Sequence, residues 1–226
     1  IVDITERKQL EMELQRLATT DPLTGAANRR SFIQQAQAEI ARARRYATPL
    51  ALLMLDIDHF KQINDSLGHA AGDEAIREVF HCCARLVRVQ DMVGRLGGEE
   101  FAILLPQTDR AAAQALAERL REQLAGIALH KDGQPVRGLT ASFGVAVLLA
   151  QDLSIDGMLG RADEALYRAK NRGRNCVEVS AGSADREDDL DVVGEVPANI
   201  IPATGSSPST PNVANSAVSA SRPAPN

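Results

Sequence analysis

Two pairs of carboxylates in this chain could hold a hard metal cation. Asp56 and Asp58 come at the end of an apolar run, and Glu99 and Glu100 follow directly after two glycines. If the strand that ends at Asp56 lies beside a hairpin carrying Glu99, the two carboxylates converge, and the carbonyl of Ile57 could complete a site for Mg2+ against a triphosphate. Asp56 and Asp58 could instead only cap the helix that follows them. That alternative leaves the second acidic pair unexplained.

Gly97 and Gly98 give the second acidic pair its setting. Glycine lets a backbone approach phosphates closely, so glycines beside clustered carboxylates indicate a metal-dependent enzyme acting on nucleotides. The two glycines could also do no more than form a type I′ turn, for which Gly-Gly is well suited. Taken alone, the turn is the simpler interpretation, and the functional one depends on the acids that follow.

Amide, carboxylate and basic side chains nearby are candidate nucleotide contacts. Asn64 and Asp73 could read the N1–H, exocyclic amine and O6 of guanine. Alternatively, Asn64 closes a turn and Asp73 caps the next helix. Lys61, Lys170 and Arg174 are candidate phosphate contacts, although isolated basic residues are most often solvated surface.

The segment Arg88-Val89-Gln90-Asp91 precedes the glycine pair. Arg88 and Asp91 could form a local ion pair on the surface. They could also form a nucleotide clamp, with the arginine on a phosphate or a base and the aspartate on the edge of guanine. From the residues alone the ion pair is the favoured interpretation.

The elements that must position these residues alternate between helical and extended patterns. A hairpin-containing sheet with helices packed against it indicates an α+β fold rather than a Rossmann pattern. The predicted elements are a helix from a cap at Asn28 toward Tyr46, a doubly covered strand at 50–55, a short helix near 59–67 ended by Gly68, a helix starting at Asp73, a hairpin of 93–96 and 101–105, a helix over 113–124, a strand at 139–148, a helix over 159–169 and an edge strand at 176–179.

Composition and charge restrict the class of protein. The chain has 226 residues, a net charge of −5 and 44% hydrophobic residues, which is typical of a globular domain with appendages. The acidic balance argues against nucleic-acid binding. Neither a signal segment nor an apolar run near the roughly 20 residues of a membrane span is present. Cys82, Cys83 and Cys176 lack metal-type spacing, so we expect reduced cysteines in a cytoplasmic protein without membrane contact in this stretch.

The chain divides into three zones. Residues 1–20 contain a helical segment with Leu10, Leu14 and Leu17 on one stripe, residues 21–180 carry the alternating elements, and residues 181–226 are rich in Ser, Pro, Ala and Asn. The last zone has an acidic cluster at 185–191 and no periodicity. We expect it to be disordered, because it cannot bury enough apolar surface to offset its ordering entropy.

Five segments together resemble the GGDEF-domain diguanylate cyclases of bacteria. They are 21–30 (DPLTGAANRR), 56–73 (DIDHFKQINDSLGHAAGD), 95–101 (RLGGEEF), 140–144 (TASFG) and 162–175 (ADEALYRAKNRGRN), and they cover the chain from 21 to about 179. Five motifs in the same order are far more specific than any one of them, and GGEEF is an accepted variant of the name-giving pattern. Ala26 is a departure, because a leucine is common there, and we expect it to affect packing more than chemistry.

The resemblance implies a fold like nucleotidyl cyclases and the polymerase palm, with an antiparallel-rich central sheet surrounded by helices. It implies condensation of two GTP into cyclic di-GMP and two pyrophosphates. It assigns Mg2+, with Mn2+ as an alternative, to Asp56, the Ile57 carbonyl and Glu99, and it assigns deprotonation of the attacking 3′-hydroxyl to Glu99 or Glu100. The implied substrate contacts are Asn64, His69 and Asp73, with Asn64 and Asp73 on guanine, then Phe60, Lys61, Lys170 and Arg174 on the phosphate side, and Gly97 and Gly98 at the turn.

Partners and regulation also follow from the resemblance. Each domain would bind one GTP, so two copies must face each other as a homodimer. Arg88 and Asp91 match the family's RxxD site, which raises the clamp interpretation above the ion pair and predicts inhibition by the product. Residues 1–7 look like the end of a PAS sensor domain and residues 8–18 like a signalling helix that pairs as a coiled coil. The alternative is a helix docked on its own domain. The full-length protein could be membrane-anchored upstream.

Three other functions are open alternatives. A catalytically silent cyclic di-GMP receptor would bind through Arg88 and Asp91, but such receptors usually have a broken signature. A dimerisation or scaffold module would not need the intact set of Asp56, Glu99, Asn64 and Asp73. A cyclase with another base preference is disfavoured by Asp73 as a reader of guanine.

Overall fold

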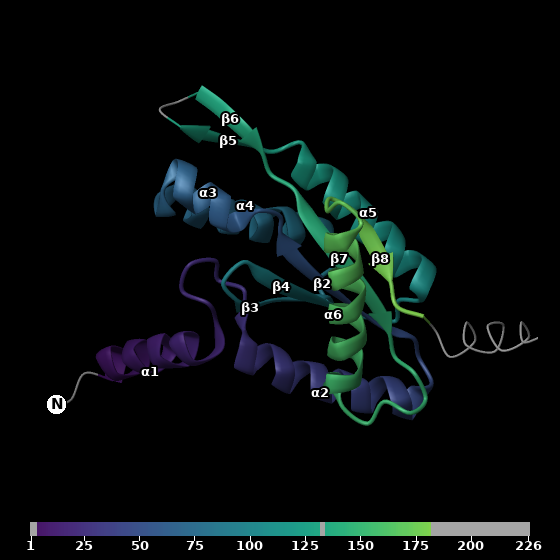
Figure 1. The fold of residues 1–226 in the computed structure, drawn as a ribbon. Coiled ribbons are helices and arrows are strands. Elements are labelled where there is room, and N and C mark those ends of the chain that lie inside the picture. The colour runs from purple at the N-terminus through teal and green to yellow at the C-terminus, as the bar shows by residue number, and fades with distance from the viewer. Residues whose placement is uncertain (1–3, 132–133, 182–226) are drawn as a thin grey trace, which may run out of the picture. The chain divides into compact units, whose positions relative to one another are not determined.

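The structure, a computed structural model, describes residues 4–131 and 134–181 (Figure 1). The predicted disordered tail therefore lies outside the described residues except for its first residue, as do the first three residues of the PAS-like segment. In chain order the elements are α1 (Ile4–Thr19), β1 (Ala27–Asn28), α2 (Arg29–Tyr46), β2 (Leu50–Ile57), α3 (Phe60–Leu67), α4 (His69–Leu86), β3 (Met92–Gly97), β4 (Glu100–Pro106), α5 (Arg110–Ala125), β5 (Ala128–Lys131), β6 (Gln134–Gly138), β7 (Ala141–Val147), α6 (Ile155–Asn171) and β8 (Val177–Val179).

A six-stranded sheet in the order β1-β3-β4-β2-β7-β8 forms the centre of the fold. The pairs β3–β4, β4–β2 and β2–β7 are antiparallel, and only the outer pairs β1–β3 and β7–β8 are parallel. The apolar residues of α3, α4 and α5 pack on one face, and those of α2 and α6 pack on the other (Figure 1). The predicted α+β fold with an antiparallel-rich sheet surrounded by helices is confirmed.

The central strand β2 is buried along its whole length. Its residues alternate between the two cores, with Leu53 and Leu55 facing α3–α5 and Leu52 and Met54 facing α2 and α6. Burial on both faces explains why this strand reads as a continuous apolar run. The strand continues two residues beyond its predicted end, so Asp56 is a strand residue held on both sides by neighbouring strands.

Gly144 explains how α6 comes to lie against the sheet. A Cβ at this position would lie 2.0 Å from the carbonyl oxygen of Ala162 and 2.5 Å from the amide nitrogen of Leu166. The backbone of α6 therefore rests directly on β7, which only glycine permits. This close approach brings the end of α6 over the carboxyl end of β2.

Helix boundaries agree with the sequence at two positions and differ at a third. Asn28 caps α2 by accepting the amide of Ser31 at 3.0 Å, and Gly68, with φ of 88°, ends α3. The helix predicted to start at Asp73 begins instead at His69, because Gly68 ends one helix and opens the next without a spacer. Asp73 lies inside α4, so the helix-capping alternative for Asp73 is wrong.

Among the peripheral elements, one hairpin differs from the prediction. The hairpin of β5 and β6 was not predicted, because its short strands lack alternating apolar residues and include Pro135. In α1, Leu10 and Leu17 are exposed rather than packed on the domain. No helix of the described residues is long and apolar enough to cross a membrane.

Candidate active site

Strand register brings the two acidic segments together. Asp56 lies opposite Glu100 of β4 on one side and opposite Ser142 of β7 on the other. Glu99 precedes Glu100 in the turn between β3 and β4. Directly opposite residues of antiparallel strands point to the same face, so Asp56 and Glu100 share the face covered by α6.

Asp56 is a buried carboxylate with one cationic partner. Its residue is 7% exposed, and Lys170 Nζ of α6 lies 2.8 Å from its Oδ2. Burial raises the pKa of Asp56, the bond and charge of Lys170 oppose that rise, and repulsion from Glu99 and Glu100 adds to it, so that the pKa lies above its ordinary value. The single lysine does not compensate the acidic charge, which leaves an electrostatic demand for a further cation.

The available donor atoms fit a hard divalent cation. Within the described residues, no group of three or more His, Cys, Asp and Glu side chains forms a metal cluster. Carboxylates of Asp56 and Glu99 and the main-chain oxygen of Ile57 are all oxygen donors. Such donors suit Mg2+ or Mn2+ rather than a thiophilic metal.

The turn between β3 and β4 differs from a type I′ Gly-Gly turn. Its central residues are Gly98 and Glu99, and of these only Gly98, with φ of 50°, has a left-handed backbone. A type I′ turn needs positive φ at both central residues. The type I′ alternative is therefore wrong, although Gly97, with φ of 156°, and Gly98 both adopt backbone conformations that residues with side chains rarely adopt.

Arg95 holds this turn, and reasoning from single residues missed it. Its guanidinium donates to the carbonyl oxygen of Gly98 at 3.0 and 2.7 Å and to the carboxylate of Asp21 at 3.0 and 3.1 Å. Asp21 also accepts the amide and hydroxyl of Thr24. Burial raises the pKa of Asp21, but the bonds from Thr24 and Arg95 outweigh it and hold that pKa below its ordinary value. The ionised Asp21 thus fixes Arg95, and Arg95 fixes the turn.

The predicted guanine contacts lie on the packed helices α3 and α4. Asn64 is half-buried inside α3, so its turn-closing alternative is wrong. A Cβ on Gly72 would lie 2.0 Å from Asn64 Oδ1 and 3.2 Å from Cζ of Phe60. Gly72 therefore makes room for the Asn64 amide beside Asp73, which is exposed. Nothing in the sequence around Gly72 indicated this close approach.

The remaining predicted substrate contacts, on the phosphate side and at His69, lie at helix ends. Phe60 begins α3 and is half-buried, Lys61 follows it and is exposed, and His69 is the exposed first residue of α4. Arg174 is exposed after the end of α6, with φ of 66°. Of the basic candidates, Lys170 is the one that contacts a predicted metal ligand.

The helix-capping alternative for the first acidic pair is wrong. The N-cap residue of α3 is His59, which has φ of 58° and makes no side-chain capping bond. Asp56 contacts Lys170, and Asp58 accepts hydrogen bonds from Ser142 Oγ at 2.6 Å and from the amide of Asn175 at 2.9 Å. Both carboxylates thus face the end of α6 and the connection to β8.

Arg88 and Asp91 do not form an ion pair in the described part of the chain. Asp91 Oδ2 accepts the main-chain amide of Arg88 at 2.7 Å, and its Oδ1 is buried without a hydrogen-bond partner. Both residues line a pocket of about 240 Å³ that also includes Arg119 of α5. The pocket lies at the start of β3, whereas the acidic turn lies at its end. Arg119 gave no signal in the sequence.

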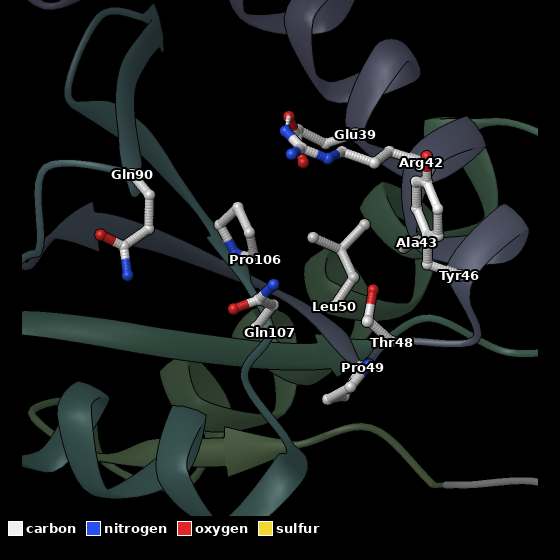
Figure 2. A pocket seen from close by; sticks show the side chains of 10 residues that line it. All are labelled: Glu39, Arg42, Ala43, Tyr46, Thr48, Pro49, Leu50, Gln90, Pro106 and Gln107. Carbon is white, nitrogen blue, oxygen red and sulfur yellow. Dashed lines mark ion pairs between the residues drawn. The ribbon is translucent and has the colours of Figure 1, made fainter.

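A separate hollow of about 450 Å³ lies between α2 and the ends of β2 and β4 (Figure 2). Its wall includes an ion pair between Glu39 and Arg42, 3.7 Å apart, and the exposed ring of Tyr46. Leu50, which lines it, begins β2, and Asp56 lies near the other end of that strand. The hollow contains none of the predicted site residues, so its size does not identify the nucleotide site.

Comparison with known proteins links this geometry to one family. Residues 18–176 match the family model described as "Diguanylate cyclase, GGDEF domain". The chain is 42% identical over 163 residues to the diguanylate cyclase DgcP of Pseudomonas aeruginosa, covering 72% of this chain and 24% of that protein. It is 42% identical over 175 residues to the diguanylate cyclase DgcM of Escherichia coli K12, covering 77% of this chain and 42% of that protein. The chain thus spans less than half the length of either curated relative.

A solved structure is similar along most of the described chain. The coiled coil and GGDEF domain of DgcB from Caulobacter crescentus, in complex with c-di-GMP, superimposes with a TM-score of 0.74 at 34% identity. The match covers 78% of this chain and 93% of that one.

Proposed function

The chain belongs to the GGDEF family of diguanylate cyclases, and we propose that it condenses two molecules of GTP into cyclic di-GMP and two pyrophosphates. The observation that carries this proposal is the register that sets Asp56 against Glu100, with Glu99 in the adjoining turn and Lys170 on the same carboxylate. A silent receptor or a scaffold would not require an intact acidic site of this kind.

Each group of site residues has a separate task in the proposed reaction. Asn64 and Asp73 bind the edge of guanine, and Lys170 and Arg174 bind the phosphates that leave as pyrophosphate. Glu99 or Glu100 takes the proton of the attacking 3′-hydroxyl. The 3′-oxygen of one GTP forms a bond to the α-phosphorus of the other as the bond from that phosphorus to the β-phosphate bridge breaks, and the same exchange closes the ring.

A divalent cation is part of this proposal. Asp56, Glu99 and the Ile57 carbonyl would hold it, and Mg2+ is the proposed ion with Mn2+ as the alternative. When bound, the cation would neutralise the negative charge that develops on the phosphates as the leaving group departs. We also propose that the reaction takes place in the cytoplasm, where GTP is available.

Two copies are needed, because each domain is proposed to bind a single GTP. The exposed Leu10 and Leu17 of α1 leave apolar surface on that helix that a second copy could cover, as in a coiled coil. We propose that α1 joins the cyclase to an upstream PAS sensor domain. The alternative of a helix docked on its own domain does not bury these two leucines.

The direct test is incubation of the purified chain with GTP and MgCl2 at a series of protein concentrations, with nucleotides resolved by chromatography. We expect cyclic di-GMP and two pyrophosphates per product, a rate that rises more steeply than protein concentration, and no product after chelation of the metal. If GTP is not consumed at any concentration while cyclic di-GMP still binds, the receptor function replaces the cyclase.

Replacing Arg95 should impair catalysis without removing any proposed ligand. Arg95→Ala deletes the bonds to Gly98 and Asp21, so we expect the rate of synthesis to fall roughly 10- to 100-fold, because misplacement of a catalytic group by about 1 Å has an effect of that order. Arg95→Lys keeps a cation beside Asp21 but cannot bridge both partners, and it should restore only part of the rate. Steady-state assays of both variants test this expectation, and a full rate in Arg95→Ala would contradict it.

Product inhibition is proposed at the pocket of Arg88, Asp91 and Arg119. The buried, partnerless Oδ1 of Asp91 would accept from the N1–H and amine of guanine once the pocket opens to expose it, and Arg88 and Arg119 line the same pocket. Arg88→Ala should raise the steady-state yield and raise the inhibitory concentration of cyclic di-GMP about tenfold or more. The initial rate should stay unchanged, because the pocket lies away from the acidic turn. Unchanged inhibition in the variant would remove this pocket as the regulatory site.

A further inference from the structure

Asp58 is a buried carboxylate that the proposed reaction does not use. It is 2% exposed, and within the described residues it has no ion-pair partner. Its Oδ1 accepts from the hydroxyl of Ser142, and its Oδ2 accepts from the main-chain amide of Asn175, 117 residues away in the chain. A charge buried without a cation is unfavourable unless its hydrogen bonds are strong. The two hydrogen bonds that Asp58 accepts are therefore what compensates for its burial.

The segment bonded to Asp58 has an unusual backbone. Gly173, Arg174 and Asn175 have consecutive φ values of 114°, 66° and 46°. Residues other than glycine adopt such values only where surrounding contacts hold them. The amide of Arg174 donates to the carbonyl oxygen of Ala169, and the amide of Asn175 donates to Asp58. The second of these bonds is charge-assisted and thus the stronger constraint.

The same segment carries two of the three cations predicted for the phosphates. Lys170 lies 2.8 Å from Asp56, and Arg174 follows one turn later, next to the amide that Asp58 holds. Asp56 and Asp58, at the end of β2, therefore both hold the stretch from Lys170 to Asn175, one at each end. Asp56 and Lys170 both have other ligands in the proposed reaction. The bond from the Asn175 amide to Asp58, like that from Arg121 to the Asn175 side chain, involves no group that the reaction uses, so it can persist throughout the reaction.

We propose that Asp58 is a positioning residue for the triphosphate. Its carboxylate holds the amide of Asn175 and so fixes the left-handed backbone that directs Arg174 toward the phosphates. This inference rests on the proposed function, because it assigns Arg174 to the phosphates of GTP.

A double-mutant cycle separates positioning from general stability. The probes are the α,β-methylene analogue of GTP, which cannot react at the bond that breaks, and GMP, each measured by calorimetric titration with MgCl2. In Asp58→Asn, an amide NH2 group, which can only donate, replaces one accepting oxygen. We expect triphosphate binding to weaken about tenfold, the equivalent of one charge-assisted hydrogen bond. GMP binding should change less than about twofold, within the scatter of independent sites. In the Arg174→Ala background the effect of Asp58→Asn on the triphosphate should disappear.

A matched pair at Asn175 tests the same link from its other end. Asn175 is half-buried, so its variants place less strain on folding than a change at Asp58. Asn175→Val disfavours a φ of 46° because its side chain is β-branched, and it should reproduce the tenfold loss. Asn175→Gly keeps the amide and tolerates the same φ, and it should retain triphosphate binding. Amide hydrogen exchange should quicken at 173–176 in Asn175→Val but not in Asn175→Gly.

The possible outcomes lead to different conclusions. Equal losses for GMP and the triphosphate, or an undiminished effect of Asp58→Asn in the Arg174→Ala background, would overturn the positioning role. Equal binding by Asn175→Val and Asn175→Gly would overturn it as well. Normal triphosphate binding by Asp58→Asn contradicts only the role of Asp58, whereas failure of the wild-type chain to bind the analogue contradicts the proposed function itself.

Discussion

Asp56→Asn should lower the rate of cyclic di-GMP synthesis about 10³-fold without lowering the thermal midpoint of unfolding. The amide keeps the size of the side chain but removes the charge that the proposed cation and Lys170 both require. Burial, only partly offset by Lys170, raises the pKa of this carboxyl above its ordinary value. A carboxyl whose pKa is raised by folding costs stability at pH values above that pKa. Removing its charge should therefore leave the folded domain as stable as before or more so at neutral pH.

Asp65→Asn is the matched control, because Asp65 is an exposed aspartate of the neighbouring helix α3. We expect it to retain the wild-type rate and midpoint. Steady-state rates at several MgCl2 concentrations and a thermal melt of each variant provide the comparison. If Asp56→Asn kept more than about a tenth of the wild-type rate, Asp56 could not be a ligand on which the chemistry depends.

Gly144→Ala should have the largest effect on stability. The added methyl group would lie 2.0 Å from the carbonyl oxygen of Ala162, so α6 must move off β7. Overpacking against a backbone should lower the free energy of unfolding by roughly 3 kcal/mol. For a domain of this size, that loss should lower the thermal midpoint by roughly 6–12 °C. Because α6 carries Lys170, the variant should also bind the triphosphate of GTP more weakly at temperatures where it is still folded.

Gly160→Ala separates this clash from the general effect of replacing glycine. Gly160 lies inside the same helix, and a Cβ there would meet nothing within 4 Å. Alanine in a helix interior should stabilise the domain by about 0.5–1 kcal/mol relative to glycine. Opposite shifts of the midpoint in the two variants, measured by calorimetry, support direct packing of α6 on β7. A midpoint for Gly144→Ala equal to that of the wild type would contradict it.

Much of the local structure could be predicted from the residues because short-range signals determine it. The apolar run at β2 indicated a strand covered on both faces, Asn28 indicated a helix start, and Gly68 a helix end. The α+β class followed from a hairpin among helices. The local signals gave the wrong start for α4 and the wrong turn type at Gly97 and Gly98. At both places the neighbouring residues allow two different backbone conformations.

The arrangement of the site depended on contacts that no local pattern encodes. Register alone decides that Asp56 faces Glu100, and close packing at Gly144 decides that α6 brings Lys170 to the same carboxylate. Likewise the bonds of Arg95 to Asp21 and of Asp58 to Asn175 join segments far apart in the chain.

The sequence by itself determined most of the strands and helices and which residue types could bind a cation and a nucleotide, because periodicity, capping and turn preferences act over a few neighbouring residues. The tertiary structure decided which of those residues meet and which additional residues hold them. The physical reason is that strand register and helix docking are settled by burial on both faces of the sheet at once, which depends on residues from the whole domain.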